Sequence, residues 1–452
     1  MSEGDTIVSL ATIAGESALG VIRVSGKLCK DLCKEIFNIA SPTPRSAILR
    51  NYLSIKGKTV DQVLLTFFEN GKSYTGEQTL ELTFHGNPLI ANQILDDLIK
   101  RKCRLAEPGE YTKRAFLNGK IDLSQAEAVA ELISATSEIE IEIANHQLRG
   151  SLSKRLHIIQ SGIINLQAQF EASIDFPEDE IKEKNVGEIL AIVKPLKSAI
   201  TQLINSTNIK STLSQGIKIS LIGPPNVGKS TLFNKLVHEN RALVSKDSGT
   251  TRDYLSKELS IGGYKVELFD TAGIRKTTSE VEQLGILNSI RLIDDSAIVL
   301  LVFDSSLPYP SEFYNSIRKE IKSKAILVVE NKNDLNREIA SKDYPRDTKV
   351  ITTSMIEDNC SENIISEIEK VLSDQFKINP SSDILVSKRQ SNHLVDALAH
   401  LNEVVSLISS SINEEIILQE LKLSIECINS IIGRTDNEDM LDQLFKNFCI
   451  GK

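Results

Sequence analysis

GPPNVGKS, residues 223–230, stands between an apolar run at 217–222 and a segment at 231–237 whose apolar residues recur at helical spacing. A buried strand, a glycine-bounded loop and a helix in this order are typical of a phosphate-binding loop. The glycines let backbone N–H groups approach a polyphosphate, and the start of the helix adds unpaired N–H groups. Lys229 would reach the β- and γ-phosphates, and the Ser230 hydroxyl would bind Mg²⁺. The stretch predicts a nucleoside triphosphate site, with a glycine-rich turn that binds no ligand as the alternative.

Length and composition limit the classes of protein to consider. The chain has 452 residues, more than one hydrophobic core normally holds, so two or three domains are expected. Its net charge of −9 argues against broad affinity for nucleic acid, so any RNA contact would be local or supplied by a partner. The six cysteines form no CxxC pair, and neither a secretory signal nor a run long enough to cross a bilayer is apparent. These features predict a cytoplasmic protein with free thiols and no membrane association.

The first block, residues 1–119, predicts a compact α+β domain because short strand-like apolar runs alternate with helical ones. Strands are expected at 6–13, 21–25, 60–68 and 79–84, and helices at 28–37 and 89–102. The composition of this block alone indicates no ligand.

Helical spacing dominates residues 120–213 and 378–452, on either side of an α/β block at 214–377. Ser124 and Glu127 have the spacing of a capping box, in which Ser124 would accept the third helical N–H and Glu127 would reach back. A long helix is expected along the apolar stripe at 148–174, and a helical run at 186–204 should be bent or broken at Pro195. The economical interpretation is one all-α domain interrupted by an inserted domain. Separate bundles before and after the insertion are the alternative.

The α/β block carries further nucleotide motifs in the order of a P-loop G domain. A strand at 265–269 ends in DTAG, residues 270–273, which would hold Mg²⁺ through water and sense a γ-phosphate. A strand at 325–329 runs into NKND, residues 331–334, where a carboxylate can accept hydrogen bonds from guanine N1–H and the exocyclic amine. Adenine presents no such pair, so the motif predicts GTP rather than ATP. After a last strand, a backbone N–H in the turn at 354–355 could contact the guanine oxygen.

The loop DSGTTRD, residues 247–253, lies between the phosphate loop and DTAG. A threonine in a mobile loop here can close over Mg²⁺ when the γ-phosphate is present, and Thr251 is the candidate. An ordinary solvated loop is the alternative interpretation.

The residue after DTAG poses a chemical problem. It is Ile274, which cannot position an attacking water as the glutamine of Ras-like enzymes does. Another group must therefore orient the water, and a cation must offset the developing charge. Asn226 offers a side-chain oxygen suited to a monovalent cation, and Glu280 and Glu282 lie a short distance downstream of DTAG.

Six stretches together resemble the MnmE (TrmE) family of bacterial tRNA-modification GTPases. They are GPPNVGKS, DSGTTRD, DTAGIR, NKND, FLNGKIDLSQAEA at 116–128 and the terminal FCIGK at 448–452. The chain departs from the family pattern at 14–20, where AGESALG replaces the usual Pro-Gly-Arg-Gly run, which affects the loop beside the family's folate pocket. It also has Ser354-Met355 where Ser-Ala is usual, so the larger Met355 side chain must point away from the base.

The resemblance implies a homodimer joined through its N-terminal domains, with a G domain inserted into the helical domain. It implies Mg²⁺-dependent GTP hydrolysis when two G domains meet, with K⁺ in the part of an arginine finger. It also implies work with a flavin-containing partner of the GidA (MnmG) type. The two would add an aminomethyl or carboxymethylaminomethyl group to C5 of the wobble uridine of certain tRNAs, with 5-formyl- or 5,10-methylene-tetrahydrofolate as the one-carbon donor.

The resemblance also assigns residues to these ligands. The folate-type donor would be held by Arg23, Glu81, Lys120 and Lys452, with Cys449 nearby. GTP would be bound by Asn226, Val227, Gly228, Lys229, Ser230, Thr231, Ser245, Lys246, Asp247, Ser248, Gly249, Thr250, Thr251, Asp270, Thr271, Ala272, Gly273, Asn331, Lys332, Asp334, Ser354 and Met355. Mg²⁺ would be bound by Ser230 and Thr251, and K⁺ by Asn226, Ser245, Asp247 and Thr250. In catalysis, Glu282 would orient the water and Asn226 would hold the cation.

Two other classes of function remain open from the sequence. A K⁺-dependent ribosome-assembly GTPase would share the phosphate loop but would normally append a basic RNA-binding domain, whereas this chain is acidic. A nucleotide-gated interaction protein with little turnover would differ from an enzyme only in its kinetics.

Overall fold

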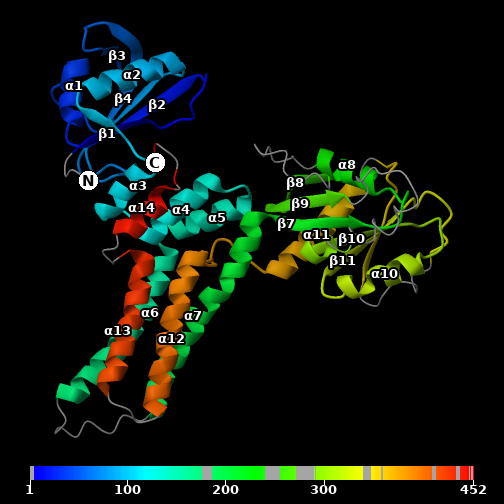
Figure 1. Ribbon diagram of the computed structural model, residues 1–452. Helices are drawn as coiled ribbons and strands as arrows, with labels where there is room; N and C mark the ends of the chain where they lie inside the picture. Colours follow the sequence, from blue (N-terminus) through cyan, green and yellow to red (C-terminus); the bar gives the residue numbers. More distant parts are fainter. Residues whose placement is uncertain are drawn as a thin grey trace. The chain divides into compact units, whose positions relative to one another are not determined.

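The structure, a computed structural model, describes most of the chain. The described residues are 5–175, 186–239, 255–270, 290, 292–339, 348–357, 360–409, 414–433, 438–446, 448 and 451. They divide into two compact units, the first formed by Met1–Ile133, Gln147–Ala199 and His393–Lys452, and the second by Ser134–His146 and Ile200–Asn392. The α+β, all-α and α/β parts predicted from the sequence are all present (Figure 1).

The N-terminal part is a six-stranded sheet with helices against its apolar face. Its strands are β1 (Thr6–Leu10), β2 (Leu19–Ser25), β3 (Ala47–Leu53), β4 (Thr59–Phe68), β5 (Thr79–His85) and β6 (Cys103–Leu105), in the order β3-β4-β5-β2-β1-β6. Its helices are α1 (Cys29–Phe37), α2 (Pro88–Lys100) and α3 (Glu110–Leu117). Ile22 and Val24 of β2 share one core with Leu32 of α1 and Ile94 of α2. Because strand residues alternate between faces, Arg23 lies on the other side of the sheet, opposite Glu81 of β5.

Three elements of this part were not predicted, and one strand was predicted too long. Strands β3 and β6 and helix α3 were not predicted, and the first strand was predicted to reach residue 13 although β1 ends at Leu10. Strand β3 lies at the sheet edge, and Tyr52 is its only buried residue. An edge strand with so few buried side chains lacks the apolar alternation by which strands are recognised.

The helical part is built from segments on both sides of the α/β block. Its helices are α4 (Leu123–Ser134), α5 (Glu138–Leu148), α6 (Ser151–Asp175), α7 (Val186–Gln215), α12 (Lys388–Ser409), α13 (Glu414–Ile432) and α14 (Glu438–Lys446). Helices α6 and α13 pack together, and the Gln160 side chain donates to Asn429 Oδ1 at 2.7 Å. This packing confirms an all-α domain that the α/β domain interrupts. Helix α7 continues through Pro195, so of the bend or break predicted there the break does not occur.

The start of α4 differs from the predicted capping box. Asp122 Oδ1 accepts from the Gln125 N–H at 3.0 Å, and Gln125 Oε1 accepts from the Asp122 N–H at 3.0 Å. The reciprocal cap therefore lies two residues before the predicted one. Ser124 is inside the helix, where its hydroxyl donates to Asp122. The prediction of Ser124 and Glu127 was wrong because DLSQAE satisfies the capping pattern in two registers, and aspartate is as good an N-cap as serine.

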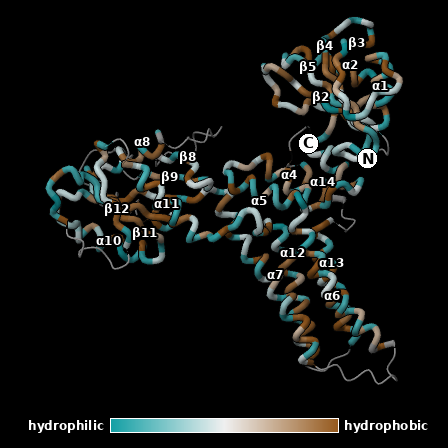
Figure 2. Tube along the Cα trace, turned by 180° about the vertical axis from the view of Figure 1, so that it is seen from behind, coloured by the Kyte–Doolittle hydropathy of each residue, from teal (hydrophilic) through white to brown (hydrophobic). Residues whose placement is uncertain are grey.

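The α/β part is a second six-stranded sheet. Its strands are β7 (Ile217–Ile222), β8 (Leu255–Ile261), β9 (Tyr264–Asp270), β10 (Ile298–Asp304), β11 (Ala325–Asn331) and β12 (Lys349–Thr352), in the order β12-β11-β10-β7-β9-β8. Helices α8 (Lys229–Glu239), α10 (Ser311–Ile321) and α11 (Cys360–Phe376) accompany it. Every residue of β10 is buried, and apolar residues concentrate in these strands (Figure 2). All strand pairs are parallel except β8 with β9, so the loops after β7, β9, β10 and β11 emerge at one edge.

No helix within the described ranges combines the length and the apolar character required to span a bilayer.

Candidate functional site

The phosphate loop joins β7 to α8 in a conformation that depends on left-handed residues. Asn226 has φ +63° and Gly228 has φ +101°, and α8 begins at Lys229. The Lys229 side chain is buried, and its Nζ donates to the carbonyls of Gly223 at 2.8 Å and Pro224 at 2.6 Å. Burial lowers the pKa of Lys229, while nearby Asp270 opposes that shift. The ammonium group thus lies across the loop, where a phosphate oxygen can replace the two carbonyls.

A hydroxyl and a carboxylate lie together at the start of α8. Ser230 Oγ donates to Asp270 Oδ2 at 2.8 Å, and Asp270 at the end of β9 is only 1% exposed. Oxygen donors of this kind are those that Mg²⁺ prefers in nucleotide sites. The first residue of DTAG is therefore adjacent to the last residue of GPPNVGKS, as the two motifs require.

Asn331 connects three loops that are far apart in the sequence. Its Nδ2 donates to the Val227 carbonyl at 2.8 Å, and its Oδ1 accepts from the Met355 N–H at 3.1 Å. A Cβ on Gly228 would lie 2.3 Å from Asn331 Nδ2, so the glycine is needed for this approach. The residues predicted to bind phosphate and guanine thus meet at the same sheet edge.

In the turn that is predicted to contact guanine, the side chains of Asp334 and Met355 point in the directions expected from the sequence. The Asp334 carboxylate accepts from the Ser354 hydroxyl, which places these two predicted residues side by side. The Met355 side chain is buried in the core, with its sulfur 3.9 Å from Cys360 Sγ, as expected for a side chain that points away from the base. The Met355 N–H is already bonded to Asn331.

Asp304 is a functional candidate that the sequence analysis missed. It ends β10, and its Oδ2 lies 2.6 Å from the Nζ of Lys332, a residue with φ +64°. Although burial acts in the opposite direction, hydrogen bonds from Lys332 and Ser306 hold the pKa of Asp304 below its usual value. The sequence could have indicated Asp304, because an aspartate at the carboxyl end of a central parallel strand lies at the ligand-binding edge of the sheet.

A second cluster lies on the polar face of the N-terminal sheet. Arg23 Nη2 lies 2.8 Å from Glu81 Oε1, and Arg23 Nη1 donates to the Gly451 carbonyl at 3.3 Å. The Arg23 guanidinium stands 5.8 Å from the centre of the Tyr111 ring, whose hydroxyl donates to the Arg23 carbonyl at 2.7 Å. Two predicted folate ligands are thus in contact, and the C-terminal tail reaches them. Predicted Lys120 donates to the Gly71 carbonyl at 2.9 Å.

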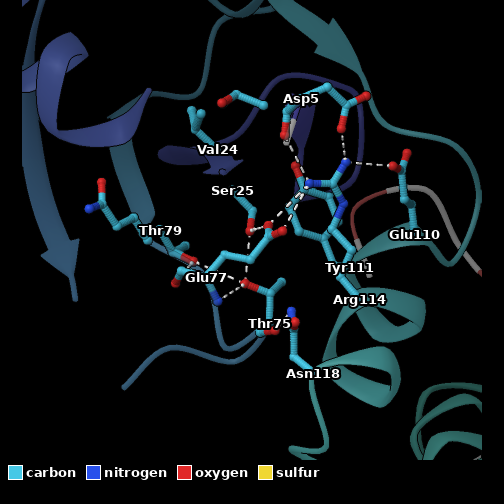
Figure 3. A network of polar contacts seen from close by, with 12 residues as sticks. Asp5, Val24, Ser25, Thr75, Glu77, Thr79, Glu110, Tyr111, Arg114 and Asn118 are labelled. Atoms are coloured by element: carbon cyan, nitrogen blue, oxygen red, sulfur yellow. Dashed lines mark hydrogen bonds and ion pairs between the residues drawn. The ribbon is translucent and has the colours of Figure 1, made fainter. Parts of the chain in front are cut away.

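A buried arginine anchors α3, which carries Tyr111, to this sheet (Figure 3). Arg114 donates to Asp5 Oδ1 at 2.6 Å, Glu110 Oε1 at 2.9 Å and Glu77 Oε2 at 3.1 Å. Ser25 Oγ of β2 donates to the same Glu77 oxygen at 2.8 Å. The network therefore sets where Tyr111 meets Arg23. Sequence reasoning missed it because its members are separated by up to 109 positions and form no motif.

The loop at 14–20, which departs from the family pattern, forms one wall of a small cavity of about 170 Å³. The opposite wall comes from the end of β5 and the start of α2, with Phe84, Pro88 and Ala91. Gly20 lies in β2 and pairs with Phe84 of β5, and a Cβ on Gly20 would lie 2.4 Å from the Phe84 ring, so the pairing of the two strands requires glycine here. The altered loop is attached to the end of β5, where the Ser17 N–H donates to the Gly86 carbonyl at 2.9 Å.

Several predicted residues lie outside the described part of the chain. They are Ser245, Lys246, Asp247, Ser248, Gly249, Thr250, Thr251, Thr271, Ala272, Gly273, Glu282, Cys449 and Lys452. Of the predicted K⁺ ligands, the structure places Asn226, which is exposed in the phosphate loop.

Comparison with known proteins gives consistent matches over the whole chain. A family model described as "MnmE helical domain" matches residues 123–449, and one described as "GTP-binding protein TrmE N-terminus" matches residues 6–120. A relative from Opitutus terrae, named tRNA modification GTPase MnmE, is 39% identical, with 99% of each chain covered. Relatives with the same name from Aquifex aeolicus and Thermotoga maritima are 37% and 35% identical, each covering 99% of this chain and 100% of the relative.

Proposed function

Since this chain belongs to the MnmE family of tRNA modification GTPases, we propose that its GTP hydrolysis is stimulated by K⁺ and serves to modify C5 of the wobble uridine in certain tRNAs. The observation that carries the nucleotide half of this proposal is the convergence of Lys229, Asp270 and Asn331 at one sheet edge. The fold thereby presents a cation, a Mg²⁺-type oxygen pair and a base-reading loop to one ligand.

Each of these groups has a task when GTP binds. Lys229 exchanges its two carbonyl partners for phosphate oxygens, which are stronger acceptors because they are charged. Ser230 and Asp270 present oxygens to Mg²⁺, which neutralises phosphate charge when bound. Asp334 accepts from guanine N1–H and the exocyclic amine. The N–H groups at the start of α8 add positive potential at the β-phosphate.

The proposed catalytic step needs a cation and an oriented water, since Ile274 replaces the Ras-like glutamine. Asn226, Ser245, Asp247 and Thr250 would hold K⁺ where positive charge stabilises the transition state, and Glu282 would orient the water. The binding of K⁺ and the orientation of the water both depend on a homodimer in which two G domains meet. The exposed position of Asn226 in the phosphate loop supports its part in this arrangement.

Hydrolysis is expected to be several-fold or more faster in KCl than in NaCl or choline chloride at the same ionic strength. The reason is that a site built from amide and hydroxyl oxygens discriminates cations by size and hydration, which a general salt effect does not. Steady-state phosphate release at saturating GTP and Mg²⁺ measures this. In Asn226→Ala the KCl advantage should shrink towards equality. Equal rates of the parent protein in all three salts would remove the K⁺ part of the proposal.

The modification half of the proposal rests on the N-terminal cluster. Arg23 and Glu81, with the Gly451 carbonyl beside them, offer a guanidinium and a carboxylate that suit the charged and amide groups of a 5-formyl- or 5,10-methylene-tetrahydrofolate. Lys120 and Lys452 would add positive charge. A flavin-containing partner of the GidA type and the tRNA would complete the reaction in the cytoplasm, with the partner supplying the redox chemistry.

Mass spectrometry of wobble nucleosides tests this function. Cells that lack the chain should lose the aminomethyl- and carboxymethylaminomethyl-uridines, because the proposed one-carbon transfer to C5 requires the Arg23–Glu81 cluster of this chain. The parent gene should restore them, whereas Lys229→Ala should not. Unchanged wobble nucleosides together with abnormal ribosomal subunit profiles would favour the ribosome-assembly alternative instead.

A further inference from the structure

A charged residue is completely buried one position before the guanine-reading motif. Glu330 of β11 is 0% exposed, and its Oε1 accepts from Arg337 Nη2 at 2.8 Å. Arg337 lies beyond NKND in the same loop, and its side chain is 42% exposed. Burying a carboxylate is unfavourable unless a cation and hydrogen bonds compensate it. Packing alone therefore does not explain why a charged residue occupies position 330.

The position of Glu330 in the sheet shows what the pair can do. Its register partners are Phe303 in β10 and Thr352 in β12. Because neighbouring residues of a strand point to opposite faces, the side chain of Glu330 lies on the face opposite to that of Asn331. On one face, Asn331 donates to the phosphate loop. On the other face, Glu330 accepts from Arg337, which lies in the part of the loop that follows NKND.

Asp334 lies between two ion pairs of this loop. Before it, Lys332 pairs with Asp304, and after it, Arg337 pairs with Glu330. The Leu335 N–H closes a turn onto the Lys332 carbonyl at 3.0 Å. The loop is thus attached to β10 on one side of Asp334 and to β11 on the other, which restricts where the carboxylate of Asp334 can go.

The pair is not arranged for the greatest stability. Glu330 Oε2 is buried and has no hydrogen-bond partner among the residues that the structure describes. An apolar residue of similar size would avoid this unfavourable burial. A carboxylate with one unbonded oxygen is therefore better explained by a task for the arginine that it holds.

We propose that the Glu330–Arg337 ion pair positions the guanine-reading loop and thereby sets the selectivity of this chain for guanine nucleotide, although neither residue touches the nucleotide. The inference rests on the proposed contact between Asp334 and the base. It names two positioning residues that lie outside the nucleotide motifs. Loss of either partner lets the segment from Lys332 to Arg337 shift. The two hydrogen bonds that Asp334 would accept from guanine then lose their geometry.

The test compares GTP with inosine triphosphate, which lacks the exocyclic amine that Asp334 would bind. Glu330→Gln keeps the shape and removes the charge, and Arg337→Gln removes the cation. Each should reduce the preference for GTP over inosine triphosphate by about tenfold and speed the release of fluorescent GDP, with kcat at saturating GTP little changed. The double variant should be no worse than either single one, because the two residues act as one unit. Arg337→Lys should recover part of the preference.

A matched control is the exposed ion pair of Lys218 with Asp295. The substitution Asp295→Asn should leave the affinities for GTP and for inosine triphosphate unchanged. If the Glu330–Arg337 pair is merely structural, its loss would lower the unfolding temperature and weaken the binding of both nucleotides equally. That result would overturn the inference. Asp334→Ala separates the two proposals. If it abolishes the preference while the Glu330 and Arg337 variants keep it, only the positioning role fails. If Asp334→Ala keeps the preference, the proposed base contact fails first.

Discussion

Replacing Asp334 with asparagine is expected to lower the affinity for GTP by roughly two to four orders of magnitude and to raise that for xanthosine triphosphate. The carboxylate accepts two charge-assisted hydrogen bonds from guanine, each worth about 1.5–3 kcal/mol, whereas an amide offers one acceptor and opposes a donor to the guanine amine. Xanthine carries a carbonyl in place of that amine, so the asparagine N–H₂ gains a partner. Asp334 is fixed for this task by its bond from Ser354.

Competition between fluorescent GDP and each triphosphate measures this exchange of preference. Asp374→Asn is the control, because Asp374 is an exposed aspartate on α11 and undergoes the same chemical change. The control should bind GTP normally. Retention of full GTP affinity by Asp334→Asn would mean that another group reads the base.

Replacing Gly228 with alanine is expected to weaken GTP binding by roughly a hundredfold or more. The new Cβ would lie 2.3 Å from Asn331 Nδ2, at a residue with φ +101°. The left-handed conformation is unfavourable for alanine by about 1–2 kcal/mol, and loss of the bond from Asn331 to the buried Val227 carbonyl adds about 1–3 kcal/mol. Asn331 must then move, and it takes the guanine loop away from the phosphate loop.

Isothermal titration with GTP and thermal unfolding of the same variant separate binding from stability. Gly57→Ala is the matched control, because Gly57 has φ +72° in a turn where an added Cβ meets nothing within 4 Å. It should lose about 1 kcal/mol of stability and leave nucleotide binding unchanged. Normal GTP binding by Gly228→Ala would show that the Asn331 bridge is dispensable.

The parts of this molecule that could be predicted are those whose pattern lies in neighbouring residues of the sequence. The phosphate loop is read from eight neighbouring residues, and its flanking strand was placed at 217–222, as the structure has it. Strand β11 was recognised at 325–329 because this run is uniformly apolar, as is typical of a strand in the interior of a parallel sheet. The edge strand β3 carries no such pattern and was missed.

Side-chain partners could not be predicted where only strand or helix packing brings them together. The cap of α4 was assigned to Ser124 because the local pattern allows two registers, and only the folded chain chooses Asp122. The pair of Asp304 with Lys332 exists because β10 lies beside β11. Arg114 finds Asp5 and Glu77 only when α3 lies against β2 and its neighbours.

The sequence by itself determined the family, the order of the three parts and the chemistry of the nucleotide motifs, because these depend on residue types at short, fixed spacings. Tertiary structure alone decided that Asn331 connects its own loop to two others and that Arg23 meets both Glu81 and the C-terminal tail. It also decided that Glu330 pairs with Arg337 in the loop after NKND. The physical reason is that a hydrogen bond or ion pair requires approach to within a few ångströms, and that approach is set by how whole strands and helices pack.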